Sequence, residues 1–158
     1  MNRESGQTLL DTATAYHRTL RELATGLRGL IAFDEAGQDA ELEQTKAFLS
    51  CLEHHARRLE ALVGAQATAD GDSSRARLWR YTPQESPPER VAVRMRQRDM
   101  TADGMMTSAL AAQNDMVGWL ENLADQAPPI AIQDELRRLA ELERTATREL
   151  AACAQGIP

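Results

Sequence analysis

The chain has few of the residues that build β-sheets. Aromatic residues make up 4% of its 158 residues, and valine and isoleucine occur only four times each. Alanine and leucine, which favour helices, occur 26 and 19 times. Hydrophobic residues account for 42% of the chain, which is enough apolar material for a core. We therefore expect a single all-α domain over residues 1–158.

Several functional signatures are also missing. The sequence has no run of 18 apolar residues, and residues 1–7 are polar and unlike a signal peptide. We therefore expect a cytoplasmic protein that does not enter a membrane. Its two cysteines, Cys51 and Cys153, form neither a CxxC motif nor a Cys/His spacing typical of zinc. They lie far apart in the sequence and do not indicate a disulfide scaffold.

The charge of the chain is unevenly distributed. The formal net charge is −6, which argues against nucleic acid as a partner. Residues 75–98, however, carry seven arginines and two glutamates, a local charge of +5. This segment is either a solvated linker that pairs with acidic helix faces or a contact surface for a second copy or another protein. The second reading predicts an interaction surface made by Trp79, Tyr81, Arg90 and Arg94, with the aromatic rings as anchors.

Apolar residues recur at spacings of three and four along four segments. These stripes predict helices over residues 8–28, 39–63, 101–126 and 130–154. Thr8 and Asp11 are spaced as in a capping box at the first helix start. Residues 67–100 break the pattern, and we expect them to form a long crossover without regular structure. The sequence thus predicts a four-helix bundle of two antiparallel hairpins joined by that crossover.

Two helical segments carry a family resemblance. Residues 119–125 (Trp-Leu-Glu-Asn-Leu-Ala-Asp) are similar to an aromatic-x-x-x-Leu-Ala-x segment in the third helix of ferritin-like, rubrerythrin-type four-helix bundles. Residues 136–143 (Leu-Arg-Arg-Leu-Ala-Glu-Leu-Glu) are similar to the Leu-x-x-Leu-Ala-x-x-Glu segment of the fourth. The resemblance covers the four helices, about two thirds of the chain, and implies a ferritin-like fold.

The di-iron ligands of that family are missing. They comprise a Glu on two helices and a Glu-x-x-His motif on the other two. The matching positions of the first and third helices hold Ala13 and Gln113, and Glu143 is followed three residues later by Ala146. No Glu-x-x-His motif occurs in the sequence. We therefore expect a degenerate metal site, with neither a bound metal nor another cofactor.

Three polar residues nevertheless fall on or beside apolar stripes. Gln113 and Glu143 lie on the stripes of the last two helices, and His55 lies on a second stripe of its helix. Because a buried unpaired carboxylate is costly, the three are expected to hydrogen-bond to one another and fix the register of the helices. In the alternatives, Glu143 reaches solvent, or the three residues are weak candidates for a metal site.

These features favour a non-enzymatic structural or protein-interaction module that forms a homodimer. One alternative is a metal-dependent oxidoreductase, di-iron or other, with non-standard ligands. Another is a histidine phosphotransfer-like module, because His54 and His55 followed by Arg58 are similar to the phosphoacceptor helix of such domains. Residues 56–59 are bulkier than the small residue and glycine that those domains place there.

Overall fold

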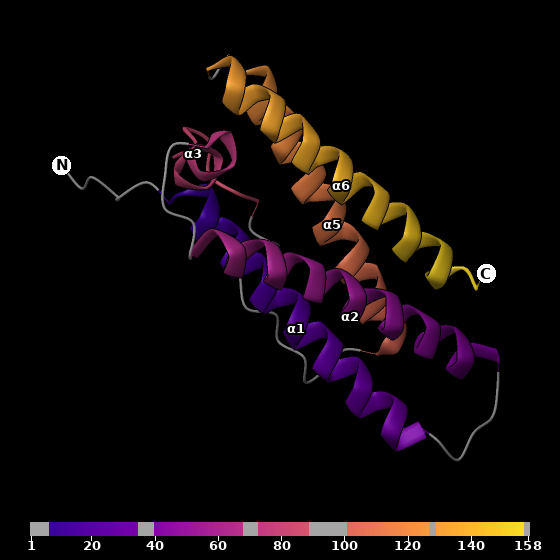
Figure 1. The fold of residues 1–158 in the computed structure, drawn as a ribbon. Helices are drawn as coiled ribbons and strands as arrows, with labels where there is room; N and C mark the ends of the chain where they lie inside the picture. The colour runs from indigo at the N-terminus through magenta and orange to yellow at the C-terminus, as the bar shows by residue number, and fades with distance from the viewer. Residues whose placement is uncertain (1–6, 35–39, 68–72, 89–100, 127–128, 157–158) are drawn as a thin grey trace.

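A computed structural model describes residues 7–34, 40–67, 73–88, 101–126 and 129–156. Within these ranges the chain forms helices and no strand, so the all-α prediction is confirmed. The helices are α1 (Leu9–Asp34), α2 (Ala40–Ala67), α3 (Ser74–Arg80), α5 (Ala102–Asp125) and α6 (Ile130–Ala154) (Figure 1). None of them is both long enough and apolar enough to span a lipid bilayer.

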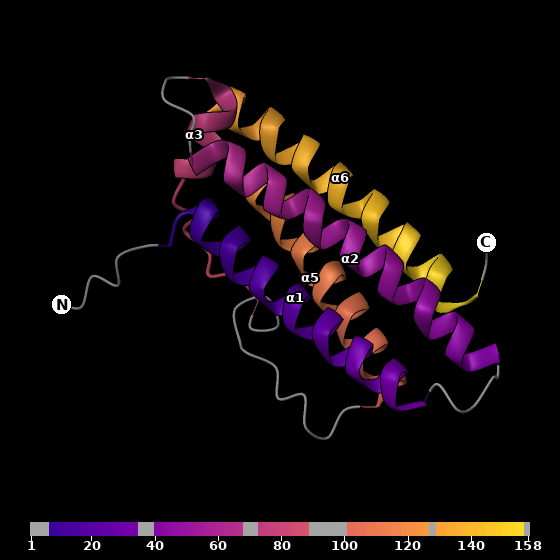
Figure 2. The ribbon, with the colours of Figure 1, turned by 60° about the horizontal axis from the view of Figure 1, so that its bottom comes forward.

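The four long helices pack side by side along their lengths (Figures 1 and 2). Helices α1 and α6 run in one direction, while α2 and α5 run in the other. The most extensive contacts between long helices join α5 to α6, α1 to α2, α2 to α6 and α1 to α5. Each of these contacts therefore joins an antiparallel pair, and the short helix α3 contacts α1 and α6 at one end of the group.

The apolar stripes read from the sequence form the core. All residues of the apolar stripe of α1 are buried except the last, Leu30. All residues of the stripe of α6 are buried except the last, Cys153. The apolar stripe of the third predicted helix includes Leu110 and Val117, which we expect in the core, but both are only half-buried, so α5 is rotated slightly from the expected orientation. The face that α5 turns to the core includes Ala109, Ala112, Met116 and Trp119. Small residues at this face let neighbouring helices approach closely, and larger ones fill the remaining space.

Helix α1 begins at the capping residues that the sequence predicts. The backbone N–H of Thr8 donates to Asp11 Oδ2 at 3.1 Å, and the N–H of Asp11 donates to Thr8 Oγ1 at 3.2 Å. This reciprocal pair is the capping box that the sequence predicts. The ends are less predictable: α1 continues through Phe33, which we expected in a loop, and α2 continues past Gly64. A single glycine costs a helix only about 1 kcal/mol, so Gly64 does not end it.

The crossover contains a helix that the sequence did not predict. Ser73 caps α3, accepting at Oγ a hydrogen bond from the N–H of Ala76 at 3.1 Å. The Tyr81 carbonyl, just after α3, accepts from the N–H of Leu9 at 2.8 Å and ties the crossover to the start of α1. The expectation of an irregular segment over residues 67–100 is thus wrong for residues 74–80. Residues 91–98, which fit a strand and a helix equally well, lie outside the described ranges.

Removing the cap of α5 is expected to cost about 1 kcal/mol of stability. Thr101 Oγ1 accepts a hydrogen bond from the N–H of Gly104 at 3.1 Å, and Thr101→Ala leaves that donor without a side-chain partner. Urea unfolding followed by circular dichroism measures the change. Thr107→Ala, at an exposed position inside the same helix, is the control and is expected to be neutral or slightly stabilising. Equal effects of the two substitutions would contradict the capping role.

Candidate functional site

Each long helix contributes one polar side chain to a buried cluster, which we call the polar layer. It consists of Tyr16 from α1, His55 from α2, Gln113 from α5 and Glu143 from α6. Gln113 is 0% and Glu143 3% exposed, so the alternative in which Glu143 reaches solvent is wrong. The sequence predicted that His55, Gln113 and Glu143 would hydrogen-bond to one another. The structure brings the three together, with hydrogen bonds between Gln113 and Glu143 but none at His55 Nε2 among the described residues. The sequence did not predict the contribution of Tyr16.

Gln113 and Glu143 join α5 to α6 through two hydrogen bonds. Gln113 Nε2 donates to the main-chain carbonyl of Glu143 at 2.9 Å and to Glu143 Oε2 at 2.5 Å. Both acceptors are oxygens of one residue, so a single amide group binds the side chain and the backbone of the facing helix. A hydrogen bond to a buried carboxylate is stronger than one between neutral groups. This contact therefore holds the two helices together at this position.

His55 and Tyr16 complete the polar layer from the side of the first hairpin. His55 Nε2 lies 3.1 Å from Glu143 Oε2, but the two atoms are not aligned as a hydrogen bond. The ring of Tyr16 contacts the imidazole of His55 edge-on, with ring centroids 6.4 Å apart and planes inclined by 61°. Glu143 therefore lies between a hydrogen-bond donor on α5 and an imidazole on α2, and the layer spans all four long helices.

Three polar atoms of the layer remain without a hydrogen-bond partner among the described residues. They are Tyr16 Oη, His55 Nε2 and Gln113 Oε1, and all three are buried. Buried polar atoms usually have partners, because leaving one unpaired costs about 1–3 kcal/mol. This concentration of unpaired atoms beside a buried carboxylate makes the polar layer the strongest candidate site inside the molecule.

Burial keeps the phenol of Tyr16 in its neutral form. Burial raises the pKa of Tyr16 well above its ordinary value of 10.0, and the negative charge of Glu143 raises it further. The hydroxyl therefore retains its proton at any physiological pH and can act as a donor, but not as a phenolate ligand or base.

The polar layer is poor in metal ligands. Of its four residues, only His55 and Glu143 belong to the His, Cys, Asp and Glu group that most often binds metals in proteins. Throughout the part of the chain that the structure describes, no three such residues gather where they could hold an ion. Structural zinc sites use four protein ligands and catalytic zinc sites use three. What this arrangement does supply is a set of contacts between neighbouring helices: α5 with α6, α6 with α2, and α2 with α1.

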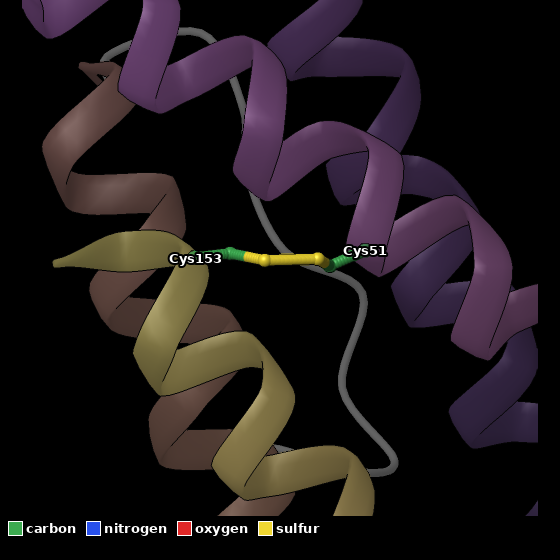
Figure 3. Close-up of a disulfide and its surroundings, with 2 residues drawn as sticks. All are labelled: Cys51 and Cys153. Atoms are coloured by element: carbon green, nitrogen blue, oxygen red, sulfur yellow. A yellow bond between two sulfur atoms is a disulfide. The ribbon is translucent and has the colours of Figure 1, made fainter. Parts of the chain in front are cut away.

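A disulfide joins α2 to the last turn of α6 (Figure 3). Cys51 and Cys153 are half-buried, and their Cα atoms lie 6.9 Å apart. The sequence did not indicate this bond. Near it, the side-chain nitrogen of Gln44 donates to the main-chain carbonyl of Ala154, so a covalent bond and a hydrogen bond both hold the end of α6 against α2.

The remaining histidines lie outside the polar layer. His54 is exposed on α2, whereas His17 is half-buried between α1 and α2. Burial lowers the pKa of His17, and the carboxylate of Glu60 opposes the shift. Salt bridges cross the same pair of helices, with Arg21 3.5 Å from Glu60 and Arg28 2.5 Å from Glu53. These contacts describe a charged outer face of a helical hairpin rather than a reaction centre.

The predicted interaction surface is only partly accessible. Trp79 is 2% exposed, because α3 turns its ring towards the other helices, so it is a core residue and not an anchor for a partner. Tyr81 is half-buried and packs against the core. Arg90 and Arg94 lie outside the described residues. The burial of Trp79 corrects the sequence interpretation, in which an aromatic residue in an irregular crossover was free to bind another chain.

Comparisons with protein-family models, curated proteins and solved structures find no match to this chain. Its function must therefore be argued from its own geometry.

Proposed function

We propose that the protein is a non-enzymatic structural or protein-interaction module built on a ferritin-like four-helix bundle. In this proposal, the polar layer occupies the place where that family carries its di-iron centre, and the protein acts as a homodimer. The directions of the helices support the fold assignment, because every extensive contact between long helices is antiparallel while α2 and α5 run the same way. Such an order requires a crossover that returns along the bundle between α2 and α5.

One observation supports the non-enzymatic role: the carboxylate of Glu143 is buried and is already in contact with side chains of the neighbouring helices. It is buried, accepts a hydrogen bond from Gln113 and lies 3.1 Å from His55. A general base or a metal ligand must reach its substrate or ion, and catalytic groups line pockets that admit them. A carboxylate enclosed by residues of three other helices instead holds those helices in register, as single buried polar residues do in some bundles.

A metal-dependent oxidoreductase is the second candidate, and one observation favours it. His55 Nε2 and Gln113 Oε1 are buried beside Glu143 without a hydrogen-bond partner among the described residues, so three groups that could bind a metal lie in one cluster. The phosphotransfer alternative is restricted to His54, because His55 is buried in the polar layer and inaccessible to a kinase.

Metal analysis of the purified protein separates the first two proposals. For a structural polar layer, we expect far less than one equivalent of iron, manganese or zinc per chain. The same low content is expected after Gln113→Leu/Glu143→Leu. A stoichiometric metal that is retained by a Glu141→Leu control but lost in the double variant would refute the structural role. It would instead establish a metal site with non-standard ligands.

The homodimer is tested by light scattering coupled to size exclusion in 0.15 M salt. The expected mass is twice the 17.5 kDa of the chain. Because Trp79 is buried, its substitution perturbs the fold and cannot report on a dimer surface. The informative variant is Arg90→Glu/Arg94→Glu, which is expected to shift the mass to that of the monomer. A wild-type protein that is strictly monomeric at 0.1 mM would remove the dimer from the proposal.

A further inference from the structure

A groove with an apolar floor opens between α2, α3 and α6, away from the polar layer. It has a volume of about 380 Å³. Its apolar lining comes from all three helices, with Leu62 on α2, Leu78 and Trp79 on α3, and Leu139 and Leu142 on α6. The groove exists because α3 packs beside the end of α2 and the middle of α6 without filling the space between them.

One wall of this groove is an exposed leucine. Leu142 is 43% exposed, and among the described residues only two other large hydrophobic side chains, Phe33 and Ile130, are exposed. Neither of those lines the groove. An apolar side chain at the mouth of an apolar groove gains from any molecule that removes both from water. This position therefore favours a ligand with an apolar body.

One cation at the rim of the groove has no ion-pair partner in the part of the chain that the structure describes. Both carboxylates at the rim are already paired, Glu135 with Arg138 at 3.1 Å and Glu141 with Arg144 at 2.5 Å. Arg75, on α3, is exposed and has no ion-pair partner among the described residues. Because no described carboxylate pairs with it, its guanidinium group can bind an anionic oxygen through charge-assisted hydrogen bonds.

From this combination we infer that the groove binds a small amphipathic molecule with an apolar body and one anionic group. The apolar body lies on the floor of the groove, and the anionic group binds Arg75. The volume falls in the range of small-molecule sites, about 300–1,000 Å³. Ten residues line the groove, whereas a stable protein interface uses about 20–30 residues on each side. The inference goes beyond the proposed function and does not depend on it.

Two fluorescent probes that differ by one charged group test the inference. 8-Anilinonaphthalene-1-sulfonate has the required apolar rings and an anionic group, and N-phenyl-1-naphthylamine has the rings alone. The sulfonate probe is expected to bind at one equivalent per chain. Arg75→Gln is expected to weaken its binding about tenfold, the equivalent of one charge-assisted hydrogen bond. The same substitution is expected to change binding of the neutral probe less than about twofold, because that probe has no group for the guanidinium.

Matched variants locate the site. Leu142→Ser is expected to weaken both probes about fivefold, because it removes apolar surface from the wall of the groove. The controls are Arg77→Gln, an exposed arginine on the same helix α3, and Ile130→Ser, the 77% exposed apolar residue of α6. Neither control residue lines the groove, so both variants are expected to bind like the wild type.

Three outcomes would overturn the inference. The first is equal weakening of the sulfonate probe by Arg75→Gln and Arg77→Gln, which would mean a diffuse charge effect. The second is equal weakening by Leu142→Ser and Ile130→Ser, which would mean unspecific binding to apolar surface. The third is a combination of two results. The protein binds the probes more weakly at concentrations where it associates with itself, and Leu142→Ser abolishes that self-association. That result would make the groove an interface with a second copy of the chain.

Discussion

Reduction of the Cys51–Cys153 bond is expected to lower the free energy of unfolding by about 4 kcal/mol. The bond joins residues separated by 102 positions, and so it closes most of the chain into one loop. In the chain-entropy account, a cross-link stabilises the fold by restricting the unfolded chain, and the effect grows with the length of the loop. Domains are stable by only about 5–15 kcal/mol, so the reduced protein is expected to lose a large share of its stability.

Urea unfolding with and without dithiothreitol measures this effect. Cys51→Ala/Cys153→Ala is expected to match the reduced wild type, and dithiothreitol is expected to have no further effect on this variant. A thiol reagent is expected to label the wild type only after reduction. Two reactive thiols in the unreduced, folded protein would contradict the bond, and so would equal urea midpoints with and without reductant.

The disulfide also bears on where the protein works. Such bonds persist in oxidising compartments and are rare in the reducing cytosol, where they are usually transient or regulatory. A cytoplasmic location, predicted from the polar residues 1–7, stays a prediction. The redox state of the two cysteines in cells tests it, since a fully oxidised pair in intact cells would contradict a reducing environment.

Sequence reasoning found the faces that carry the two cysteines but not their pairing. Cys51 extends the apolar face of the second predicted helix, and Cys153 ends the stripe of the fourth. Pairing requires Cα atoms within about 7 Å of each other. That distance depends on the offset between α2 and α6 along their common axis. The spacing of residues within each helix does not determine this offset. Packing between helices therefore supplied what the pattern within each helix could not.

Helix α3 was missed for a different reason. Its seven residues complete barely two turns, so only Ala76 and Trp79 mark a repeating apolar face. A stripe of that length is indistinguishable from chance, and the polar residues before it read as a loop. The local signal that could have found it is Ser73, placed as an N-cap before a short run with an apolar face. Tertiary burial of Trp79, rather than helix propensity, holds the segment in place.

The polar layer was more predictable, because physical chemistry restricts what a buried polar side chain can do. A glutamate and a glutamine on apolar stripes must either pair or leave the core. That requirement predicted that Gln113 and Glu143 would meet, and the structure pairs them. Tyr16 escaped notice because a tyrosine on an apolar stripe looks like any large core residue. Its hydroxyl gains significance only when the charge of Glu143 is placed near it.

Substituting Glu143 alone is expected to be among the most damaging changes to the core. Glu143→Leu removes the carboxylate acceptor of Gln113 and the group facing His55, while both partners stay buried. Breaking a buried polar pair by removing one member costs about 3–5 kcal/mol, because the other member is left without compensation. Glu141→Leu, at an exposed position on the same helix, is the control and is expected to stay within about 0.5 kcal/mol of the wild type.

Replacing the three residues of the polar layer other than Tyr16 is expected to undo most of that damage. In His55→Leu/Gln113→Leu/Glu143→Leu none of these three leaves a buried partner behind, while the Tyr16 hydroxyl stays buried as it is in the wild type. A set of apolar residues of similar size can be as stable as the polar set it replaces. We expect the triple variant to unfold within about 1 kcal/mol of the wild type, well above Glu143→Leu. The role in register then shows in a separate measurement. If the layer fixes the relative heights of the helices, the triple variant is expected to adopt more than one packing arrangement. Its amide NMR spectrum would then show more than one set of signals. A triple variant as unstable as Glu143→Leu would mean that the three side chains act independently, and a single sharp spectrum would mean that apolar packing alone sets the register.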